Sequence, residues 1–321
     1  MSSRIVFVAN AEETKAMAQE MAPAGFELVV VAPGSPEYEK ALPEADYLVG
    51  FVDMLVQEKL YQAAPRLRLI QLLSAGYDRA DLKAARKAGV PIANNGGANA
   101  VAVSEHALLL MLAVSRSLIW QHANVSAGRW RGNTSPRIRE LRGRVLGIVG
   151  LGTIGKKTAR LGNAFGMTVH YYDIARLDEA AEDALGVRFR LLNELLRTSD
   201  VISLHVPLND STRRMIGKAE LALMQPSAIL INTSRGPVVD EPALIEALAS
   251  GAIAGAGLDV FEEEPPPPDN PLFRLENVVL TAHFAGPTYE SNTTRLRNAF
   301  DNVERVARGE APLWVVPEIR A

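Results

Sequence analysis

The feature that most constrains this chain is a glycine-rich turn near its middle. The apolar residues 145–149 lead into Gly150-Leu151-Gly152-Thr153-Ile154-Gly155, and a helix-compatible segment follows. In this spacing the first glycine permits a tight turn, the second lets backbone approach a pyrophosphate, and the third lets helix and strand pack closely. Free N–H groups at the start of the helix attract the anion. Because the spacing also arises by chance, the surrounding residues decide whether it indicates a dinucleotide site.

A second apolar run supports that interpretation. Residues 167–172 end in Asp173, about twenty residues beyond the motif, where an acidic side chain accepts hydrogen bonds from ribose hydroxyls. Asp173 alone could be an ordinary turn residue. Together with the glycine motif it predicts a bound dinucleotide, and its charge favours NAD over NADP because it repels a 2'-phosphate.

Composition excludes several other classes of protein. The 321 residues suffice for two domains, and a net charge of −3 with no long basic run provides no surface for nucleic acid. The longest apolar stretch, residues 107–114, is too short to span a bilayer, and no signal peptide is expected. The absence of cysteine excludes disulfides and thiolate metal sites. We therefore expect a cytoplasmic protein without a membrane partner, which binds small molecules and copies of itself.

Short apolar runs alternate with helix-compatible stretches. Before the glycine motif, the predicted strands are residues 5–9, 28–31, 47–52, 69–73 and 90–93. From the motif onward, they are residues 145–149, 168–172, 201–205, 228–232, 253–258 and 278–281. Such alternation is typical of parallel sheets covered by helices. It predicts an α/β protein with two Rossmann-like or flavodoxin-like lobes, each a parallel sheet with helices on both faces, and a cleft between them.

Two long helix-compatible segments indicate how the lobes are connected. Residues 99–121 contain neither proline nor glycine and predict one helix that bridges the lobes. Residues 289–308 predict a final helix after the last strand, where the second sheet has no strand left to cover. We therefore expect the C-terminal segment to return to the first lobe. The predicted domains are a discontinuous substrate domain, 1–100 with 287–321, and an NAD-binding domain, 101–286.

Three polar residues that follow predicted strands form a candidate catalytic set. Arg235, Glu264 and His283 each come shortly after an apolar run of the second lobe. Ligands bind beyond the carboxyl ends of parallel strands, so these positions face a site. An arginine to hold a carboxylate, a histidine to exchange a proton and a carboxylate to orient that histidine suffice for redox chemistry at a 2-oxo or 2-hydroxy acid.

Each of these residues also has a simpler explanation. An arginine after a strand is usually solvated, and Glu264 belongs to an acidic cluster at 262–264. The five histidines show no metal-ligand spacing, so no metal site is predicted. His205 also ends an apolar strand and is the main alternative to His283 as the proton donor. The residue pattern alone does not choose between the two histidines.

The whole chain resembles the D-2-hydroxyacid dehydrogenase family, in which a discontinuous substrate lobe flanks an inserted nucleotide lobe. The stretches that carry the resemblance are Ser74-Ala75-Gly76-Tyr77-Asp78, Asn99 with residues 103–107, Gly150 to Gly155 with Asp173, residues 205–208, residues 232–236, residues 258–261 with Glu264-Pro265, and His283 with Ala285-Gly286. So many ordered matches argue against chance. One departure is Ala282, where the family usually has proline before the histidine, which loosens the expectation of a fixed loop.

The resemblance implies a role for each matched residue. Arg235 binds the substrate's carboxylate and carbonyl, His283 is the acid and base, and Glu264 is its partner. Ser74, Ala75 and Gly76 complete the substrate site, with backbone donors from the last two. The implied cofactor-binding residues are Gly150, Gly152, Thr153, Ile154, Gly155, Asp173, His205, Val206, Pro207, Thr212, Thr233, Ser234, Arg235, Asp259, His283, Ala285 and Gly286, of which Asp259 contacts the nicotinamide amide.

The resemblance implies an NAD-dependent D-2-hydroxyacid dehydrogenase that acts on small 2-oxo acids such as glyoxylate or hydroxypyruvate. The alternative is an NAD-sensing interaction protein, because some members of the family act as transcriptional corepressors. Filled catalytic positions favour the enzyme. The family is commonly dimeric, so a homodimer is expected, with the arm at 122–142, including Trp130, in contact with the partner copy.

Overall fold

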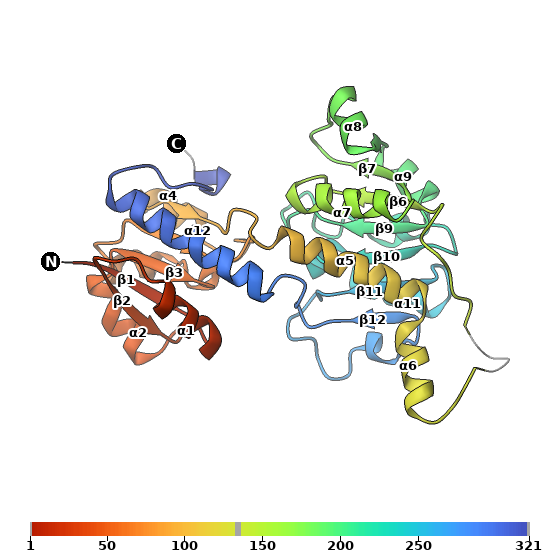
Figure 1. Cartoon of the computed structure of the whole chain (residues 1–321), viewed down its shortest axis with the longest axis horizontal. Coiled ribbons are helices and arrows are strands. Elements are labelled where there is room, and N and C mark those ends of the chain that lie inside the picture. Colours follow the sequence, from red (N-terminus) through yellow and green to blue (C-terminus); the bar gives the residue numbers. More distant parts are fainter. Residues whose placement is uncertain (1, 132–135, 320–321) are drawn as a thin grey trace. The chain divides into compact units, whose positions relative to one another are not determined.

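The computed structural model describes residues 2–131 and 136–319, which fold as two compact units (Figure 1). The first unit is Met1–Asn99 with Pro287–Ala321, and the second is Ala100–Gly286. Each contains one parallel sheet, of five strands in the first unit and seven in the second. The predicted class, two parallel α/β sheets with helices on both faces, is confirmed.

The sheet of the first unit has the order β2-β1-β3-β4-β5. Its strands are β1 (Ser3–Val8), β2 (Phe26–Val31), β3 (Tyr47–Gly50), β4 (Leu69–Leu72) and β5 (Ile92–Ala93). Alternate strand residues face opposite ways, so Val6 and Leu48 lie in one core and Ile5 and Tyr47 in the other. The sheet is therefore buried on both faces, as a parallel sheet requires.

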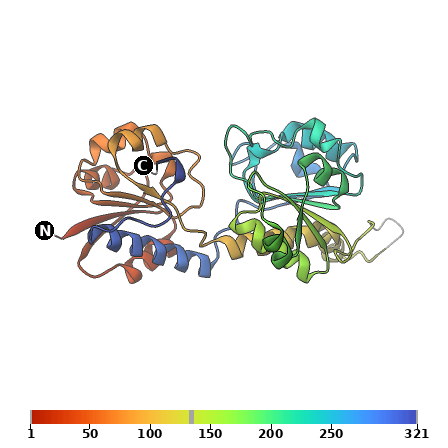
Figure 2. The same ribbon diagram turned by 90° about the horizontal axis from the view of Figure 1, so that it is seen from above.

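Helices of the first unit divide between these two faces. The helices α2 (Pro36–Ala41), α3 (Glu58–Ala63) and α4 (Leu82–Ala88) contribute to the core that contains Val6. The helices α1 (Glu12–Met21) and α12 (Tyr289–Ala307) cover the opposite face, as Figure 2 shows. Since α12 supplies Leu296, Ala299, Phe300 and Val303 to that core, the C-terminal helix belongs to the first unit.

The sheet of the second unit has the order β12-β11-β10-β9-β6-β7-β8. Its strands are β6 (Val145–Val149), β7 (Thr168–Tyr172), β8 (Val187–Phe189), β9 (Val201–Leu204), β10 (Ile229–Asn232), β11 (Gly255–Leu258) and β12 (Val278–Leu280). Because β7 lies on one side of β6 and β9 on the other, the winding reverses at β6. Open α/β sheets bind ligands beyond the carboxyl ends of strands at such a reversal.

Helices also cover both faces of the second sheet. On one face, α5 (Ala100–Ser115) and α7 (Thr153–Ala164) pack against β6 and β10. The other face is covered by α9 (Leu192–Thr198), α10 (Lys218–Leu221) and α11 (Glu241–Ala249). A short helix, α8 (Glu179–Leu185), precedes β8. The two cores fix the sheet and hence the loops at its carboxyl edge.

Two expectations about this unit are wrong. The segment expected as one helix over residues 99–121 is α5 followed by α6 (Leu118–Ser126), with a bend of 63° between them. The break lies at Ser117, whose φ of 49° is left-handed and cannot continue a right-handed helix. The sheet also has a seventh strand, β8, whose three residues are too few to show a periodic pattern.

Strand ends differ slightly from the expected ones. For example, β5 begins at Ile92 and β11 at Gly255, later than residues 90 and 253.

Within residues 2–131 and 136–319, no single helix has the length and apolar composition needed to cross a membrane, and only the bent pair α5 and α6 has them jointly.

Candidate active site

The three candidate catalytic residues lie at one edge of the second sheet. Arg235 follows β10, Glu264 follows β11 after a short loop, and His283 follows β12. These strands are parallel neighbours, since β10 pairs with β11 and β11 with β12. The carboxyl ends of parallel neighbours meet at the same edge. Residues far apart in the sequence are therefore gathered by the strand order.

His283 and Glu264 form a direct pair. Nδ1 of His283 lies 2.8 Å from Oε2 of Glu264, and the N–H of Phe261 donates to Oε1 at 3.2 Å. A carboxylate only accepts, so Nδ1 of His283 is the donor. This arrangement leaves Nε2 as the ring nitrogen that can exchange a proton with a ligand. Both side chains are partly exposed, so a ligand can reach them.

Glu264 remains ionised although it is half-buried. Burial raises the pKa of its carboxyl, but the hydrogen bond and charge of His283, the Phe261 N–H and the charge of Arg235 outweigh it and hold the pKa below its ordinary value. The carboxylate thus faces two basic groups, one on each neighbouring loop. Charge stabilisation and ring orientation come from the same side chain.

A buried aspartate fixes the loop that carries His283. Asp259 is fully buried, and its carboxylate accepts the N–H of Phe284 and the N–H of Ala285, each at 2.8 Å. Its carbonyl accepts the N–H of His283 at 2.8 Å. These bonds hold His283 at a φ of 56°, a left-handed conformation that is unfavourable for a side chain of this size.

Asp259 also reaches a second histidine. Oγ1 of Thr281 donates to the Asp259 carboxylate at 2.6 Å and lies 2.9 Å from Nε2 of His106, on α5. The loop is therefore fixed despite Ala282 in place of proline. Sequence reasoning missed this support of the backbone, and the implied contact of Asp259 with the nicotinamide amide stays a prediction.

The turn after β10 places Arg235. Asn232 donates from Nδ2 to the carbonyl of Arg235 at 3.0 Å, and its Oδ1 accepts the N–H of Ser234. A Cβ on Gly236 would lie 1.7 Å from the carbonyl oxygen of Phe261, so only glycine allows this turn to pack against the loop after β11. Because that loop also carries Glu264, the packing brings Arg235 within electrostatic range of Glu264.

The glycine motif forms an open cradle between β6 and α7. Gly150 has a φ of 96°, and a Cβ there would lie 2.8 Å from the backbone of His205. A Cβ on Gly155 would lie 2.2 Å from the carbonyl oxygen of Gly150, whereas one on Gly152 would have no atom within 4 Å. Gly152 therefore faces open space at the start of α7, which fits a pyrophosphate beside the helix N-terminus. Thr153 and Ile154 follow in the first turn.

Asp173 closes one side of this cradle. Its carboxylate accepts the N–H of Leu151 at 2.6 Å and the N–H of Ala175 at 2.9 Å, which fixes it beside the glycine turn. Arg176, the nearest following cation, pairs with Glu182 at 3.4 Å and stacks on Phe189. The arginine is thus directed away from a 2'-phosphate, and the residues present fit NAD.

His205 differs from His283 in its environment. Burial lowers the pKa of His205 to about 4, so the ring is neutral at physiological pH. Its Nε2 lies 2.9 Å from Oγ of Ser203. A neutral, partly buried ring is a poor proton donor, and the backbone of His205 instead packs against Gly150. The structure thus favours His283 as the acid, a choice that the residue pattern left open.

The remaining residues of the implied cofactor set lie along the same edge. In the segment after β9, Oγ1 of Thr212 donates to the carbonyl of Pro207 at 2.6 Å. This bond holds Thr212 close to Val206 and Pro207. Oγ1 of Thr233 is buried and has no hydrogen-bond partner among the described residues. A buried hydroxyl without a partner is costly, so a bound ligand would satisfy it. Ala285 and Gly286 end the unit.

The loop Ser74-Ala75-Gly76 lies in the first unit, after β4. Oγ of Ser74 donates to the carbonyl of Gly76 at 2.7 Å, and Asn94 donates from Nδ2 to the carbonyl of Ala75 at 3.2 Å. Further along this loop, Arg79 makes a two-pronged ion pair with the buried Asp53, at 3.0 and 2.9 Å. No pattern in the sequence indicated this pair, which ties the loops after β3 and β4 together.

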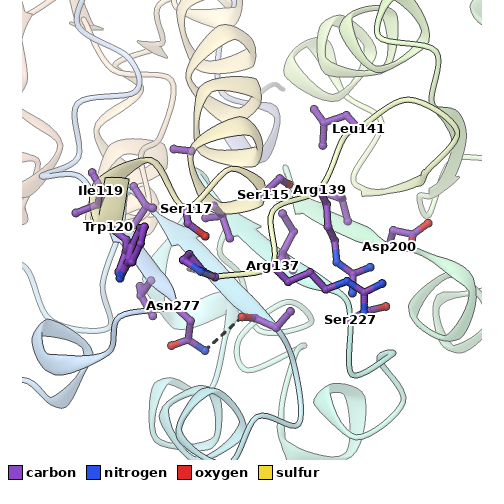
Figure 3. Close-up of a pocket in the computed structure, with 18 of the residues that line it drawn as sticks. Ser115, Ser117, Ile119, Trp120, Arg137, Arg139, Leu141, Asp200, Ser227 and Asn277 are labelled. Atoms are coloured by element: carbon purple, nitrogen blue, oxygen red, sulfur yellow. Dashed lines mark hydrogen bonds between the residues drawn. The ribbon is translucent and has the colours of Figure 1, made fainter. Parts of the chain in front are cut away.

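A pocket of about 380 Å³ lies elsewhere in the second unit (Figure 3). Asp200, Ser227 and Asn277, which line it, precede β9, β10 and β12, so it lies at the amino edge of the sheet. Trp120 of α6 and Arg137 complete its wall. The pocket therefore lies away from the catalytic edge.

Within the described residues, no three His, Asp or Glu side chains are placed to hold a metal ion.

Comparison with known proteins agrees with this geometry. Residues 108–285 match the family described as D-isomer specific 2-hydroxyacid dehydrogenase, NAD binding domain. The chain is 40% identical to a glyoxylate reductase of Korarchaeum cryptofilum over 89% of this chain and 88% of that protein. It is 43% identical to a glyoxylate reductase of Thermococcus litoralis over 84% and 82%. Among solved structures, D-lactate dehydrogenase from Aquifex aeolicus, complexed with NAD and lactic acid, superposes with a TM-score of 0.84 at 31% identity, covering 95% of this chain and 96% of that one.

Fold and site together define an NAD-dependent oxidoreductase. The chain belongs to the D-isomer specific 2-hydroxyacid dehydrogenase family. It transfers hydride between NAD(H) and a 2-oxo or D-2-hydroxy acid, as the resemblance implied. The predictions of family, enzyme class and NAD are confirmed, and the corepressor alternative is not favoured.

Proposed function

We propose that the substrate is a small 2-oxo acid of the glyoxylate or hydroxypyruvate type, reduced to the corresponding hydroxy acid. The observation that carries the proposal is the His283–Glu264 pair next to Arg235, at the edge where the glycine cradle also opens. Relatives at 40% and 43% identity named glyoxylate reductase support the choice of substrate. One 2-oxo acid, one NADH and one proton give one hydroxy acid and one NAD⁺.

Each residue has one task in this reaction. Bound NADH supplies the hydride. Arg235 binds the substrate carboxylate through its guanidinium, a geometry suited to two parallel hydrogen bonds. His283 enters as the imidazolium and donates the Nε2 proton to the carbonyl oxygen. Glu264 orients the ring through Nδ1 and stabilises its charge, and in the oxidative direction His283 takes the proton back.

The other assigned residues complete the proposed site. In the first unit, Ser74, Ala75 and Gly76 bind the substrate, with backbone N–H groups of Ala75 and Gly76 directed to its carboxylate, which makes this unit the substrate domain. The proposed contacts to NAD are those of the glycine cradle, Asp173, the segment at 205–212, Thr233 to Arg235, Asp259, His283, Ala285 and Gly286.

We further propose a cytoplasmic homodimer that binds neither nucleic acid nor membrane. The net charge of −3 supports the absence of nucleic-acid binding. In α6 and the segment that follows it, the side chains of Ile119, Val125 and Trp130 are 55%, 58% and 74% exposed. Apolar side chains gathered so on one segment are typical of an interface. The expected arm, 122–142, includes residues 132–135, which lie outside the described residues.

A substrate panel tests the proposal. Glyoxylate, hydroxypyruvate, pyruvate and phenylpyruvate are each assayed with NADH and with NADPH. We expect the highest kcat/KM for glyoxylate or hydroxypyruvate with NADH. His283→Asn should lower kcat by roughly 100- to 10,000-fold, the range for a general acid, and His205→Asn by far less. No turnover of any 2-oxo acid, or near-normal turnover by His283→Asn, would overturn the proposal.

A further inference from the structure

Arg295, on the inner face of α12, is a buried cation that has no carboxylate partner within residues 2–131 and 136–319. Its side chain is 5% exposed, and it is the one arginine classed as buried among residues 2–131 and 136–319. Nη1 donates to Oδ1 of Asn292 at 2.9 Å, but Nε has no hydrogen-bond partner within those residues. Burial lowers the pKa of Arg295 to about 10, so the guanidinium still carries its charge at neutral pH.

Three more exposed arginines of this chain are paired with buried or half-buried acids. Arg66 pairs with Asp46, Arg79 with Asp53 and Arg144 with Asp200, at 2.9 to 3.1 Å. No ion pair of Arg295 occurs among the described residues, and its closest aromatic neighbour is Phe51, with the guanidinium 5.6 Å from the ring centroid. A buried charge is unfavourable unless something pairs with it. Arg295 thus differs from these arginines both in its burial and in having no carboxylate partner among the described residues.

The position of Arg295 is at the carboxyl edge of the first sheet. Phe51 directly follows β3, and Ser74 follows the neighbouring strand β4 after Leu73. One turn along the same face of α12, Asn298 donates from Nδ2 to the carbonyl of Asn95 at 3.0 Å. The N–H of Asn95 in turn donates to the carbonyl of Ser74 at 3.1 Å. Arg295 therefore lies one helical turn before Asn298, on the face of α12 that borders the segment bonded to the proposed substrate loop.

We propose that Arg295 is a specificity-determining residue that binds a second anionic group, a carboxylate or a phosphate, at the far end of the 2-oxo acid. The inference rests on the proposed function, because it assumes that Ser74 to Gly76 bind the first carboxylate. The unpartnered Nε and the fork geometry of guanidinium suit planar or tetrahedral oxyanions. Among 2-oxo acids that reach beyond the size of glyoxylate, the enzyme should then prefer one with an anionic far end over a neutral-ended one of the same carbon number.

Pairs of substrates of equal chain length test this directly. 2-Oxoglutarate is compared with 2-oxopentanoate, oxaloacetate with 2-oxobutanoate, and 3-phosphohydroxypyruvate with hydroxypyruvate, each with NADH. The first two pairs report a carboxylate and the third a phosphate. We expect the wild type to favour the anionic-ended member of at least one pair by about tenfold or more in kcat/KM, chiefly through KM.

Variants of Arg295 identify the residue responsible. Arg295→Met keeps the packing on Phe51 and should lower kcat/KM for the favoured anionic-ended substrate by roughly 10- to 100-fold, with little change for its neutral-ended partner. Arg295→Lys keeps the charge and should recover part of the loss. Arg297→Met is the matched control, since Arg297 lies on the exposed side of the same helix. Melting temperatures show whether each variant folds.

The outcomes separate the two proposals. A wild type that reduces 2-oxo acids but favours the neutral-ended member of every pair overturns the role of Arg295 and leaves the proposed function intact. The role of Arg295 is likewise overturned if Arg295→Met lowers kcat/KM equally for both substrates of a pair. Should Arg295→Met fail to fold, the wild-type ratios together with Arg295→Lys decide. A wild type that reduces no 2-oxo acid removes the proposed function itself.

Discussion

At the scale of single residues, chemistry depends on which partner each histidine has. His283 has a carboxylate on Nδ1 and an exposed ring. His205 is only partly exposed and lies beside a hydroxyl, and desolvation lowers its pKa to about 4. Both follow parallel strands of one sheet, so position alone gives them equal standing. The carboxylate partner and the exposure of His283, against the neutral ring of His205, decide between them.

The Glu264 carboxylate should set the pH dependence of the reaction. The pKa of Glu264 is held below its ordinary value, so at neutral pH its carboxylate is charged and lies against Nδ1 of His283. Reduction consumes the imidazolium, so kcat/KM for reduction should fall as pH rises. Glu264→Gln keeps a hydrogen-bonding group but removes the charge, and the falling limb should move to lower pH.

A pair of pH profiles of kcat/KM, wild type beside Glu264→Gln, measures this shift. Glu262→Gln is the control, because Glu262 pairs with Arg214 at 2.9 Å and has no bond to His283 among the described contacts. An unmoved limb in Glu264→Gln would show that the charge of Glu264 does not act on the histidine.

At the scale of elements, the junction of β6 with α7 carries the proposed cofactor site. The three glycines of this junction have different roles. Gly150 and Gly155 are required by the fold itself, because a Cβ at either would collide with backbone at 2.8 and 2.2 Å. Gly152 has an ordinary φ of −70° and open space around it, so its lack of a side chain serves the ligand rather than the fold.

Gly152→Ala should therefore separate cofactor binding from stability. We expect an unchanged melting temperature and an NADH dissociation constant raised by roughly tenfold or more, since the new methyl keeps the pyrophosphate from the helix N-terminus. Gly217→Ala is matched to it, because Gly217 is the glycine before α10 and a Cβ there makes only ordinary contact, 3.4 Å from Glu220. Titration of NADH by fluorescence, with thermal melting of both variants, measures the two effects. Unaltered NADH affinity in Gly152→Ala would contradict this account of the cradle.

At the scale of the whole molecule, the chain builds one unit from a continuous segment and the other from two segments. Ala100–Gly286 contains its whole sheet and both of its cores, with α5 packed on β10 and β11 of the same unit. The first unit is incomplete until α12 arrives from the end of the chain. The two units should therefore differ in their ability to fold alone.

A fragment of residues 100–286 should unfold cooperatively and bind NADH, but should not reduce 2-oxo acids, because it lacks the loop at Ser74 to Gly76. A second fragment, residues 1–99, should not unfold cooperatively, since the face of its sheet that α12 covers would be exposed. Circular dichroism melts and NADH titration test both statements. A soluble, cooperative 1–99 fragment would contradict the dependence on α12.

The sequence by itself determined the parallel α/β class and the glycine cradle with Asp173. It also determined that Arg235, Glu264 and His283 follow, along the chain, the strands β10, β11 and β12. These follow from local periodicity and turn chemistry, which depend on neighbours along the chain. Only the tertiary structure decided that His205 is neutral and that His283 has a carboxylate partner, how Asp259 holds the His283 loop and where the helix breaks at Ser117. It also decided that Arg295 is buried with no acid beside it among the described residues. Burial and pairing depend on residues brought together from distant parts of the chain, and no local pattern records them.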